Sequence, residues 1–372
     1  MDSVDIVKDF FDLVRSEGVL NLARLNSKAF TRESPMDFAN LISFMLTRGS
    51  NNTTVELDKY SSSLGIQSVT RQAYSLSRQQ IDPIVFKHLN EWLVGKTYEC
   101  QSYETLKDYL ILAIDGTLLD LPWIEELKEE YGGKTNKEGE IEAISAQSSG
   151  LYDCLNETMI NFEIEPYKVS EKVLAIKNIE NSIETIKDKN PLIIFDRYYA
   201  SLELFNYLTK LNINFLFRLK KSYYKEERSK MKSNDEFINI KVTDSRLNHI
   251  KDPELKEELK KIKKFNLRVT KVILSTGEEE WLISNLPFDK FNTNEIKELY
   301  NLRWKIETSY DAIKNSLKIG RITAKKRLTV EQDFYSKITY HNLSKIIIKD
   351  TENNLDENKK NIIKSTLKQQ FH

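Results

Sequence analysis

The sequence has few of the residues that build disulfides and most metal centres. Among 372 residues there are only two cysteines, Cys100 and Cys154, and four widely separated histidines. None of these residues has CxxC or Cys/His spacing, so neither a disulfide framework nor a structural zinc site is indicated. We therefore expect any chemistry of this chain to depend on Asp and Glu.

Long apolar runs and a net charge are also missing. No stretch of about 18 uncharged apolar residues could span a membrane, and the acidic amphipathic N-terminal segment does not resemble a secretory signal. These features predict a cytoplasmic protein with no membrane partner. The 56 Lys and Arg residues are matched by 56 Asp and Glu residues, so the total charge gives no support to nucleic-acid binding.

The distribution of charge is more informative than its sum. Residues 210–232 contain eight basic and two acidic residues, and residues 318–327 (KIGRITAKKR) hold most of a second basic surplus. The first cluster is interleaved with Phe215, Phe217, Tyr223 and Tyr224. Basic, aromatic-rich surface suits a phosphate backbone, whereas a charge run alone is more often a solvated face.

Residues 1–98 have helical apolar spacing and no β-rich run. Within them, residues 55–81 read as a helix, a turn near residues 62–65 and a second helix opening near Ser68. Such a unit resembles a helix-turn-helix and could present Thr70, Arg71 and Arg78 to DNA. An ordinary helical hairpin would give the same pattern.

The next segment predicts a mixed α/β sheet. Residues 108–115 (DYLILAID) and 191–196 (PLIIFD) are apolar strands that each end on an acid, Asp115 and Asp196. Between them we predict a loop over residues 116–133, a β-hairpin over 143–166 and a helix opening at Ser170. A helix and a strand follow Asp196, and this order places helices on the faces of the sheet.

The rest of the chain completes the predicted organisation. Strand-like pieces between residues 220 and 290, around a charged helix at residues 252–264 (DPELKEELKKIKK), indicate a β-rich insertion. One further helix is predicted for residues 293–317. The predicted regions are residues 1–98 (helical, DNA-binding), 99–219 (catalytic domain, first part), 220–290 (insertion), 291–345 (catalytic domain, last part) and 346–372 (helical tail).

The helix over residues 293–317 places four functional residue types on one side. Tyr300, Arg303, Glu307 and Lys314 fall within about 60° of one another on a helical wheel. In the simpler interpretation, Arg303 and Glu307 form an exposed pair four residues apart. If the adjacent apolar stripe packs on the sheet, however, Glu307 lies near the strand ends that carry Asp115 and Asp196.

Three carboxylates at one edge repel one another, and a divalent cation would relieve that repulsion. Carboxylate oxygens without His or Cys favour Mg²⁺ or Mn²⁺. Two such ions can stabilise the attacking and leaving oxygens of a phosphoryl displacement. The three acids therefore indicate nuclease or strand-transfer chemistry.

The spacing of Tyr300, Arg303, Glu307 and Lys314 resembles the signature of DDE transposases of the insertion sequence four group. The segments AIDGTLLDLP and IIFDRYYAS resemble the blocks that carry the family's two Asp residues. The segments FTRESPMDFANLISFMLTRG and GRITAKKRLTVEQDFYSKITYHNLSK resemble its N- and C-terminal blocks. One departure is Tyr198, which stands where the second block usually has Gly.

The resemblance implies an RNase H-like catalytic domain with a β-rich insertion before the last catalytic helix and a helical N-terminal domain. It implies that Asp115, Asp196 and Glu307 are catalytic and hold Mg²⁺, for which Mn²⁺ may substitute. The expected DNA-binding residues are Tyr300, Arg303, Lys314, Arg197 and Tyr199 from the resemblance, Lys220 and Lys221 from the first basic cluster, and Arg71 from the unit that resembles a helix-turn-helix.

The implied reaction is hydrolysis at a transposon end, after which the freed 3′-hydroxyl attacks target DNA. The implied partners are double-stranded DNA, namely terminal inverted repeats and target, and a second copy of the chain in a homodimer. The implied location is a prokaryotic cytoplasm, in association with the nucleoid. Two alternatives stay open: a non-catalytic DNA-binding protein derived from a transposase, and a stand-alone two-metal nuclease of the same fold.

Overall fold

The structure is a computed structural model that describes residues 3–49, 51–99, 103–274, 276–316 and 324–353. The described strands form one mixed sheet of nine, in the order β2-β3-β1-β5-β6-β9-β8-β7, with β4 paired to β3. The strands are β1 (Leu110–Asp120), β2 (Gly133–Thr135), β3 (Ile141–Asp153), β4 (Thr158–Pro166), β5 (Pro191–Phe195), β6 (Asn214–Arg218), β7 (Asp235–Lys241), β8 (Lys264–Ile273) and β9 (Glu279–Ser284).

Five of these strands form the core of the predicted fold. β1 pairs antiparallel with β3, and β3 pairs antiparallel with β4. On its other side β1 pairs parallel with β5, and β5 pairs parallel with β6. An antiparallel meander beside two parallel strands, with helices on the faces, is the RNase H-like α/β class predicted from the sequence, and this prediction is confirmed.

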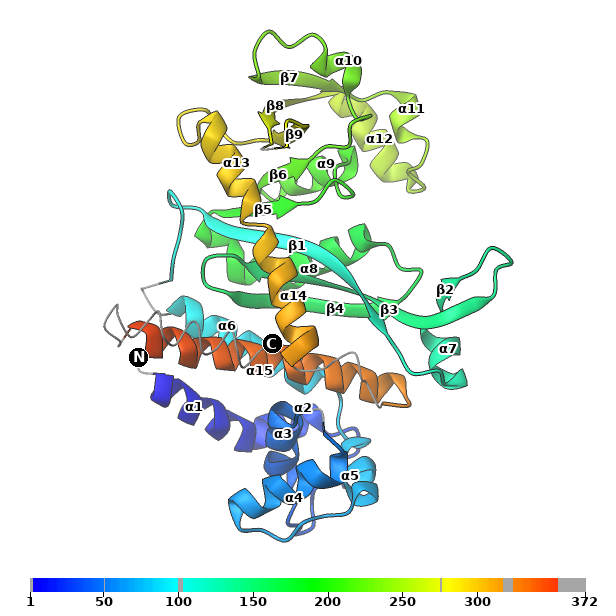
Figure 1. Ribbon diagram of the computed structural model, residues 1–372, viewed down its shortest axis with the longest axis vertical. Coiled ribbons are helices and arrows are strands. Elements are labelled where there is room, and N and C mark those ends of the chain that lie inside the picture. Colours follow the sequence, from blue (N-terminus) through cyan, green and yellow to red (C-terminus); the bar gives the residue numbers. More distant parts are fainter. Residues whose placement is uncertain (1–2, 50, 100–102, 275, 317–323, 354–372) are drawn as a thin grey trace.

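Helices cover both faces of the sheet (Figure 1). Along β1, Leu110, Leu112 and Ile114 face the side covered by α8 (Glu171–Ile186) and α9 (Leu202–Lys210), whereas Ile111 and Ala113 belong to the opposite core. A central strand with helices on both sides is apolar at nearly every position. This burial explains why the segment before Asp115 was recognisable as a strand.

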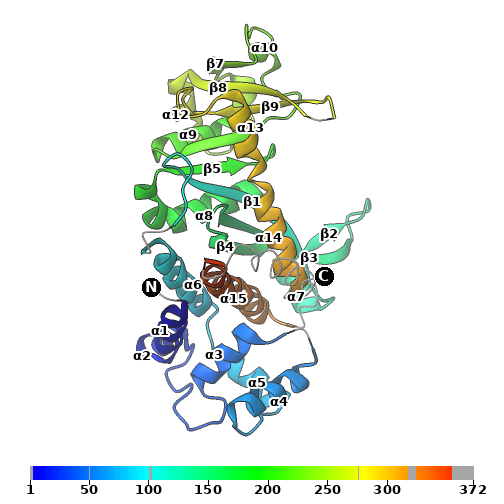
Figure 2. The ribbon, with the colours of Figure 1, turned by 60° about the vertical axis from the view of Figure 1, so that its left-hand side comes forward.

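The N-terminal region is helical, as predicted. Its helices are α1 (Ser3–Arg15), α2 (Glu17–Ala23), α3 (Phe38–Thr47), α4 (Thr53–Leu64), α5 (Arg71–Arg78) and α6 (Ile84–Glu99). The long C-terminal helix α15 (Arg327–Asn353) packs against α1, α3 and α6. It lies beside α6 (Figure 2), and both of these helices contact β4. The two ends of the described chain therefore share one apolar core.

The predicted helix-turn-helix unit corresponds to α4 and α5, but it does not present all three expected residues to solvent. The second helix begins at Arg71, because the Thr70 side chain caps it by accepting from the N–H of Ala73 at 3.1 Å. Arg71 is exposed, whereas Arg78 is 5% exposed and faces α15. The expectation that Arg78 reaches DNA is wrong in this arrangement, since its guanidinium is held inside the protein.

Two further segments differ from the predictions. The predicted loop over residues 116–133 contains the end of β1 and α7 (Glu125–Tyr131), because β3 continues to pair with β1 as far as Asp120. The predicted insertion contains β7, β8, β9 and the predicted charged helix, α12 (Pro253–Ile262), together with two short helices that were not predicted, α10 (Lys225–Arg228) and α11 (Asp244–Leu247). Its strands extend the central sheet, since β9 pairs antiparallel with β6.

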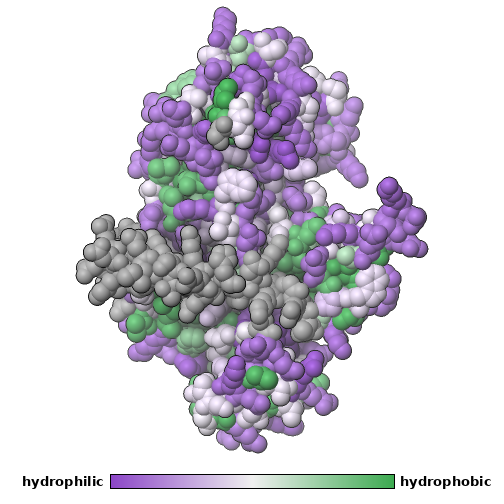
Figure 3. Space-filling model, in the orientation of Figure 1, coloured by the Kyte–Doolittle hydropathy of each residue, from purple (hydrophilic) through white to green (hydrophobic). Residues whose placement is uncertain are grey.

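The aromatic residues interleaved with the first basic cluster are mostly core residues. Phe215 and Phe217 are fully buried on β6, and Tyr224 is 8% exposed. β6 is an interior strand between β5 and β9, so the side chains along it are buried. The interpretation of these rings as DNA-facing surface is wrong, although the upper part of the molecule, around the insertion, is largely hydrophilic (Figure 3).

Among the residues that the structure describes, no helix combines the length and apolar character needed to cross a bilayer. The 3₁₀ helix at Lys187–Lys189 and α13 (Thr293–Asn301) and α14 (Trp304–Ser316) complete the described elements.

Candidate active site

The sheet register places Asp115 and Asp196 side by side. In the parallel pair of β1 and β5, Ile114 is opposite Phe195, and the next residue after each is the acid. Asp196 follows the end of β5 as predicted, whereas the prediction that Asp115 ends its strand is wrong, because β1 continues along β3 to Asp120. Neighbouring strands lie about 4.8 Å apart, so the two acids lie beside each other at the edge where the parallel pairing stops. This edge is where α/β proteins place their sites, and the apolar runs before each acid were the signal that predicted it.

The helix predicted for residues 293–317 is broken at Leu302 and Arg303, between α13 and α14. The N–H of Arg303 donates to the carbonyl of Tyr300 and the N–H of Ile306 to that of Arg303, both at 3.1 Å and three residues back. Such a turn holds about 3.0 residues instead of about 3.6. The prediction of one continuous helix is therefore wrong, and its last residue, Leu317, lies outside the described residues.

This tight turn directs Arg303 inward, where it is 4% exposed. Its Nη1 lies 2.7 Å from Oε1 of Glu307 and 3.5 Å from Oδ2 of Asp115. The hydroxyl of Tyr300 donates to Oδ1 of Asp196 at 3.4 Å, and the Arg303 guanidinium lies 5.7 Å from the centre of the Tyr300 ring. Arg303 and Tyr300 thus connect the three predicted catalytic acids to one another.

The electrostatics of the site follow from burial and from Arg303. Burial raises the pKa of Asp115 to about 6, while Arg303 and the N–H of Gly116 oppose this rise. That N–H donates to Oδ1 of Asp115 at 3.0 Å. Burial disfavours the charge of Arg303, but Tyr300, Glu307 and Asp115 outweigh burial and raise its pKa. Arg303 is therefore a permanent cation between Asp115 and Glu307.

Tyr310, which was not predicted from the sequence, packs against the backbone of Asp115. Its hydroxyl donates to the backbone carbonyl of Asp115 at 3.0 Å, and Gly150 is the residue opposite Asp115 on β3. A Cβ atom at Gly150 would lie 2.6 Å from Sδ of Met159 and 2.9 Å from the Tyr310 hydroxyl. The ring reaches Asp115 because this position has no side chain, and only the tertiary structure shows this relation.

Two further acids lie at the site. Glu171, in the first turn of α8, packs over Gly116, where an added Cβ would be 2.8 Å from its Cδ. Burial raises the pKa of Glu171, and Asp196 adds to this rise. Glu280 is 7% exposed and pairs with Arg218 at 2.8 Å. Ser170 and Glu171 were predicted as a helix start, but nothing in the sequence connects that start with Asp115.

The other predicted DNA-binding residues divide into two groups. Arg197 and Lys221 are exposed, and with Lys220 they line a hollow of about 420 Å³ that also includes Arg218, Trp281 and three acids, Glu278, Glu279 and Glu280. The Lys220 ammonium lies 4.3 Å from the centre of the ring of Tyr198. Tyr198 is the residue that stands where the second Asp block of the resembled family usually has Gly.

Tyr199, by contrast, is 1% exposed and packs against Phe195, so it supports the strand and does not face solvent. The backbone of Lys314 lies in α14, while its side chain is outside the described residues. Arg71 lies on α5 and lines a different pocket.

The three acids do not form a ready-made metal cluster. Within the described parts of the chain, no group of three or more His, Cys, Asp or Glu side chains is placed to hold a metal ion. The positive charge between Asp115 and Glu307 comes from Arg303, so the predicted gathering around shared cations is not formed in this arrangement. The donor chemistry itself suits Mg²⁺ or Mn²⁺, and sharing an ion would require Arg303 to withdraw.

Comparison with known proteins gives a family match and likenesses to solved structures. Residues 106–343 match the family described as Transposase DDE domain. A solved structure of the piggyBac transposase, in a synaptic complex with hairpin DNA, superposes with a TM-score of 0.48 at 12% identity. The aligned region covers 95% of this chain and 76% of that one. No curated protein sequence matches the chain.

Proposed function

Since the chain belongs to the family of transposase DDE domains, we propose that it cuts transposon ends and joins the freed 3′-hydroxyls to target DNA. We assign it to the insertion sequence four group, because Tyr300, Arg303, Glu307 and Lys314 keep that group's spacing. The substrates would be double-stranded DNA with terminal inverted repeats and a target duplex, held by a homodimer.

One observation carries this proposal. Asp115 on β1 and Asp196 after β5 each follow a residue of the parallel pair, Ile114 and Phe195, which lie in register, and Arg303 and Tyr300 connect them to Glu307 from a distant part of the chain. An isolated surface pair of Arg303 and Glu307 would be exposed, whereas this arginine is 4% exposed. Burying its charge costs free energy unless acids compensate it, so the contact with two acids of the site supports a functional arrangement.

Each residue has a proposed role. Asp115, Asp196 and Glu307 would hold Mg²⁺, or Mn²⁺ in its place, and the bound ions would stabilise charge on the oxygens of the phosphodiester. The N–H of Gly116 and the hydroxyl of Tyr310 fix the carboxylate and the backbone of Asp115. Once withdrawn from the acids, Arg303 would be free to contact a phosphate, as the resemblance implies.

The DNA strand would lie beside the acids. Arg197, which follows Asp196, lines the hollow with Lys220, Lys221 and three glutamates. Cations in such a hollow would bind phosphates without reading sequence. Lys314 is included as a phosphate contact on its spacing alone. Tyr199, which is buried, is proposed only as a support for the second strand.

The test compares Glu307→Gln with Asp311→Asn. Both replace an acid of α14 by its amide, but Asp311 is exposed and has no role in the proposed site. The substrate is a plasmid carrying the gene with its native flanking DNA, incubated with Mg²⁺ or Mn²⁺. Glu307→Gln should reduce cleavage by about a hundredfold or more, the scale of one group that stabilises transition-state charge. DNA binding, followed by gel shift, should be nearly unchanged.

Three outcomes would count against the proposal. Equal cleavage by Glu307→Gln and Asp311→Asn would remove Glu307 from the catalytic site. Cleavage without any joining of 3′-ends to a second DNA would indicate the stand-alone nuclease. Binding of DNA by the wild type without cleavage under either metal would indicate the non-catalytic DNA-binding protein.

A further inference from the structure

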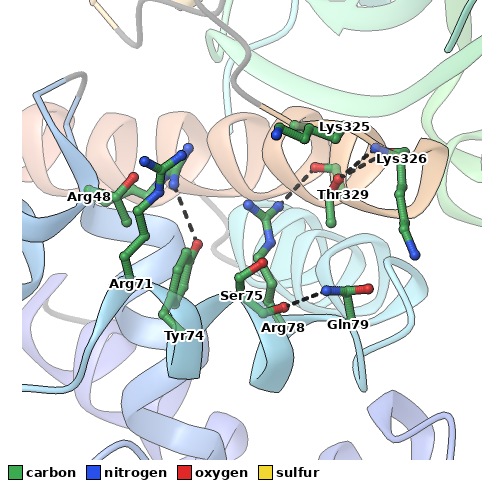
Figure 4. A pocket seen from close by; sticks show the side chains of 11 residues that line it. Arg48, Arg71, Tyr74, Ser75, Arg78, Gln79, Lys325, Lys326 and Thr329 are labelled. Atoms are coloured by element: carbon green, nitrogen blue, oxygen red, sulfur yellow. Dashed lines mark hydrogen bonds between the residues drawn. The ribbon is translucent and has the colours of Figure 1, made fainter. Parts of the chain in front are cut away.

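A pocket of about 250 Å³ lies where α5 meets the start of α15. Five cationic side chains line it, and we call it the basic pocket: Arg48, Arg71, Arg78, Lys325 and Lys326. Figure 4 shows these side chains converging from three separate parts of the chain. None of the residues that line it is acidic, and it shares no residue with the candidate active site.

The floor of the basic pocket is fixed by hydrogen bonds. Arg78 donates from Nε to Gln332 at 2.9 Å, and from Nη2 to the carbonyl of Thr329 at 2.8 Å and to Asp333 at 2.7 Å. Arg48 pairs with the same Asp333 at 3.5 Å. A single buried carboxylate therefore serves two arginines, which leaves a surplus of positive charge behind the pocket.

The rim of the basic pocket carries cations of a different kind. Arg71, Lys325 and Lys326 are exposed, and within the described residues no carboxylate forms an ion pair with any of them. Arg71 and Arg78 are seven residues apart, two turns of α5, so one face of this helix supplies both floor and rim. Lys325 and Lys326 reach the pocket from the connection that precedes α15.

This concentration of charge is unusual in a chain whose net charge is zero. Like charges held close together repel one another, and an anion between them relieves the repulsion. Arginine and lysine donors directed into one open hollow suit the oxygens of a phosphate group. The basic segment at residues 318–327, noted in the sequence, contributes two of the three rim cations.

We propose that the basic pocket binds a backbone phosphate of duplex DNA, at a position separate from the catalytic acids. The choice of DNA over another phosphate source rests on the proposed function. A phosphate contact positions a protein on DNA without reading its sequence. Because the pocket joins α5 to the start of α15, this contact would fix the N-terminal helices and the last helix against the same duplex.

The experiment measures DNA affinity against salt concentration for Arg71→Gln, Lys326→Gln and the double variant. Each lost phosphate contact reduces the slope of log K against log salt by about one. Because the pocket holds one phosphate, we expect the double variant to lower the slope by about one and each single variant to lower it by a smaller amount. Lys8→Gln is the matched control, because Lys8 is an exposed lysine on α1, a helix that contributes nothing to the pocket.

The outcomes separate this proposal from the proposed function. An equal salt dependence of DNA affinity in Arg71→Gln, Lys326→Gln and the control Lys8→Gln would overturn the proposal that the basic pocket binds a phosphate, whether or not the protein cleaves DNA. Reduced slopes in a protein that cleaves nothing would support the pocket and contradict the transposase. Inorganic phosphate that binds to the wild type but not to Arg71→Gln, with unchanged DNA slopes, would mean a free-phosphate site and would overturn the contact with DNA.

Discussion

Replacing Asp333 by Asn should destabilise the junction between the N-terminal helices and α15. The Asp333 side chain is 9% exposed. It forms ion pairs with Arg78 at 2.7 Å and with Arg48 at 3.5 Å. Asparagine keeps the shape and one acceptor oxygen but removes the negative charge. The two arginines would then be cations without a compensating acid, 6% and 14% exposed at their side chains.

The expected magnitude follows from the burial of the pair. Removing one partner of a buried ion pair costs about 3–5 kcal/mol, and the remaining acceptor of Asn returns about 1 kcal/mol. We therefore expect a loss of about 2–4 kcal/mol in the free energy of unfolding. Folded proteins are stable by about 5–15 kcal/mol, so this loss would shift the urea midpoint visibly.

Burial raises the pKa of Asp333, but Arg78 and Arg48 outweigh it, so the pKa lies below the ordinary value of 3.8. A carboxylate with a lowered folded-state pKa stabilises the fold fully above its unfolded value. This contribution is lost as the pH falls through the lower folded-state value. The difference between the wild type and Asp333→Asn should thus be complete at pH 7 and shrink in strong acid.

Urea unfolding followed by tryptophan fluorescence measures this difference, with Glu226→Gln as the matched control. Glu226 pairs with Lys230 at 3.0 Å, but both side chains are largely exposed, so its replacement should leave the midpoint unchanged. An Asp333→Asn variant as stable as Glu226→Gln at pH 7 would refute the view that this carboxylate neutralises a buried cation pair.

Two further predictions concern packing and pH. Gly150→Ala places a Cβ 2.6 Å from Met159 and 2.9 Å from the Tyr310 hydroxyl, so it should cost about 1–3 kcal/mol of stability. Gly95→Ala in α6 is the control, because open space surrounds Gly95, and it should stabilise the protein by about 0.5–1 kcal/mol. Equal urea midpoints for the two variants would contradict the crowding at Gly150. Burial lowers the pKa of Lys337 from 10.5 to about 7. Between about pH 7 and pH 10.5, therefore, Lys337 takes up a proton when the protein unfolds. The stability of the wild type relative to Lys337→Met should rise by about 1.4 kcal/mol per pH unit there, and a flat difference would disprove the shift.

The strands and both aspartates of the site could be predicted from the sequence because their signals are local. The continuous apolar run between Tyr109 and Asp115 is typical of a strand that is buried on both faces. Ser170 begins a helix because its side chain caps the first turn. The spacing from Tyr300 to Lys314 was also readable. The segment that matches the family of transposase DDE domains, residues 106–343, contains these positions.

Other features could not be predicted, because they depend on contacts between distant residues. The helix ends at Asn301 and restarts at Trp304, and Arg303, inside this tight turn, reaches an acid 188 positions away. Arg78 looked available to DNA until α15, some 250 residues later, supplied Gln332 and Asp333 as partners. Local sequence propensities could not predict either of these contacts.

The sequence by itself determined where the central strands and most of the helices lie and which acids follow the apolar runs, since these properties follow from neighbouring side chains. Only the tertiary structure decided where the charges go: that Arg303 stands between Asp115 and Glu307, and that the basic residues near both ends of the chain meet in one pocket. The reason is physical, because a charge's environment depends on what lies within a few ångströms in space and not along the chain.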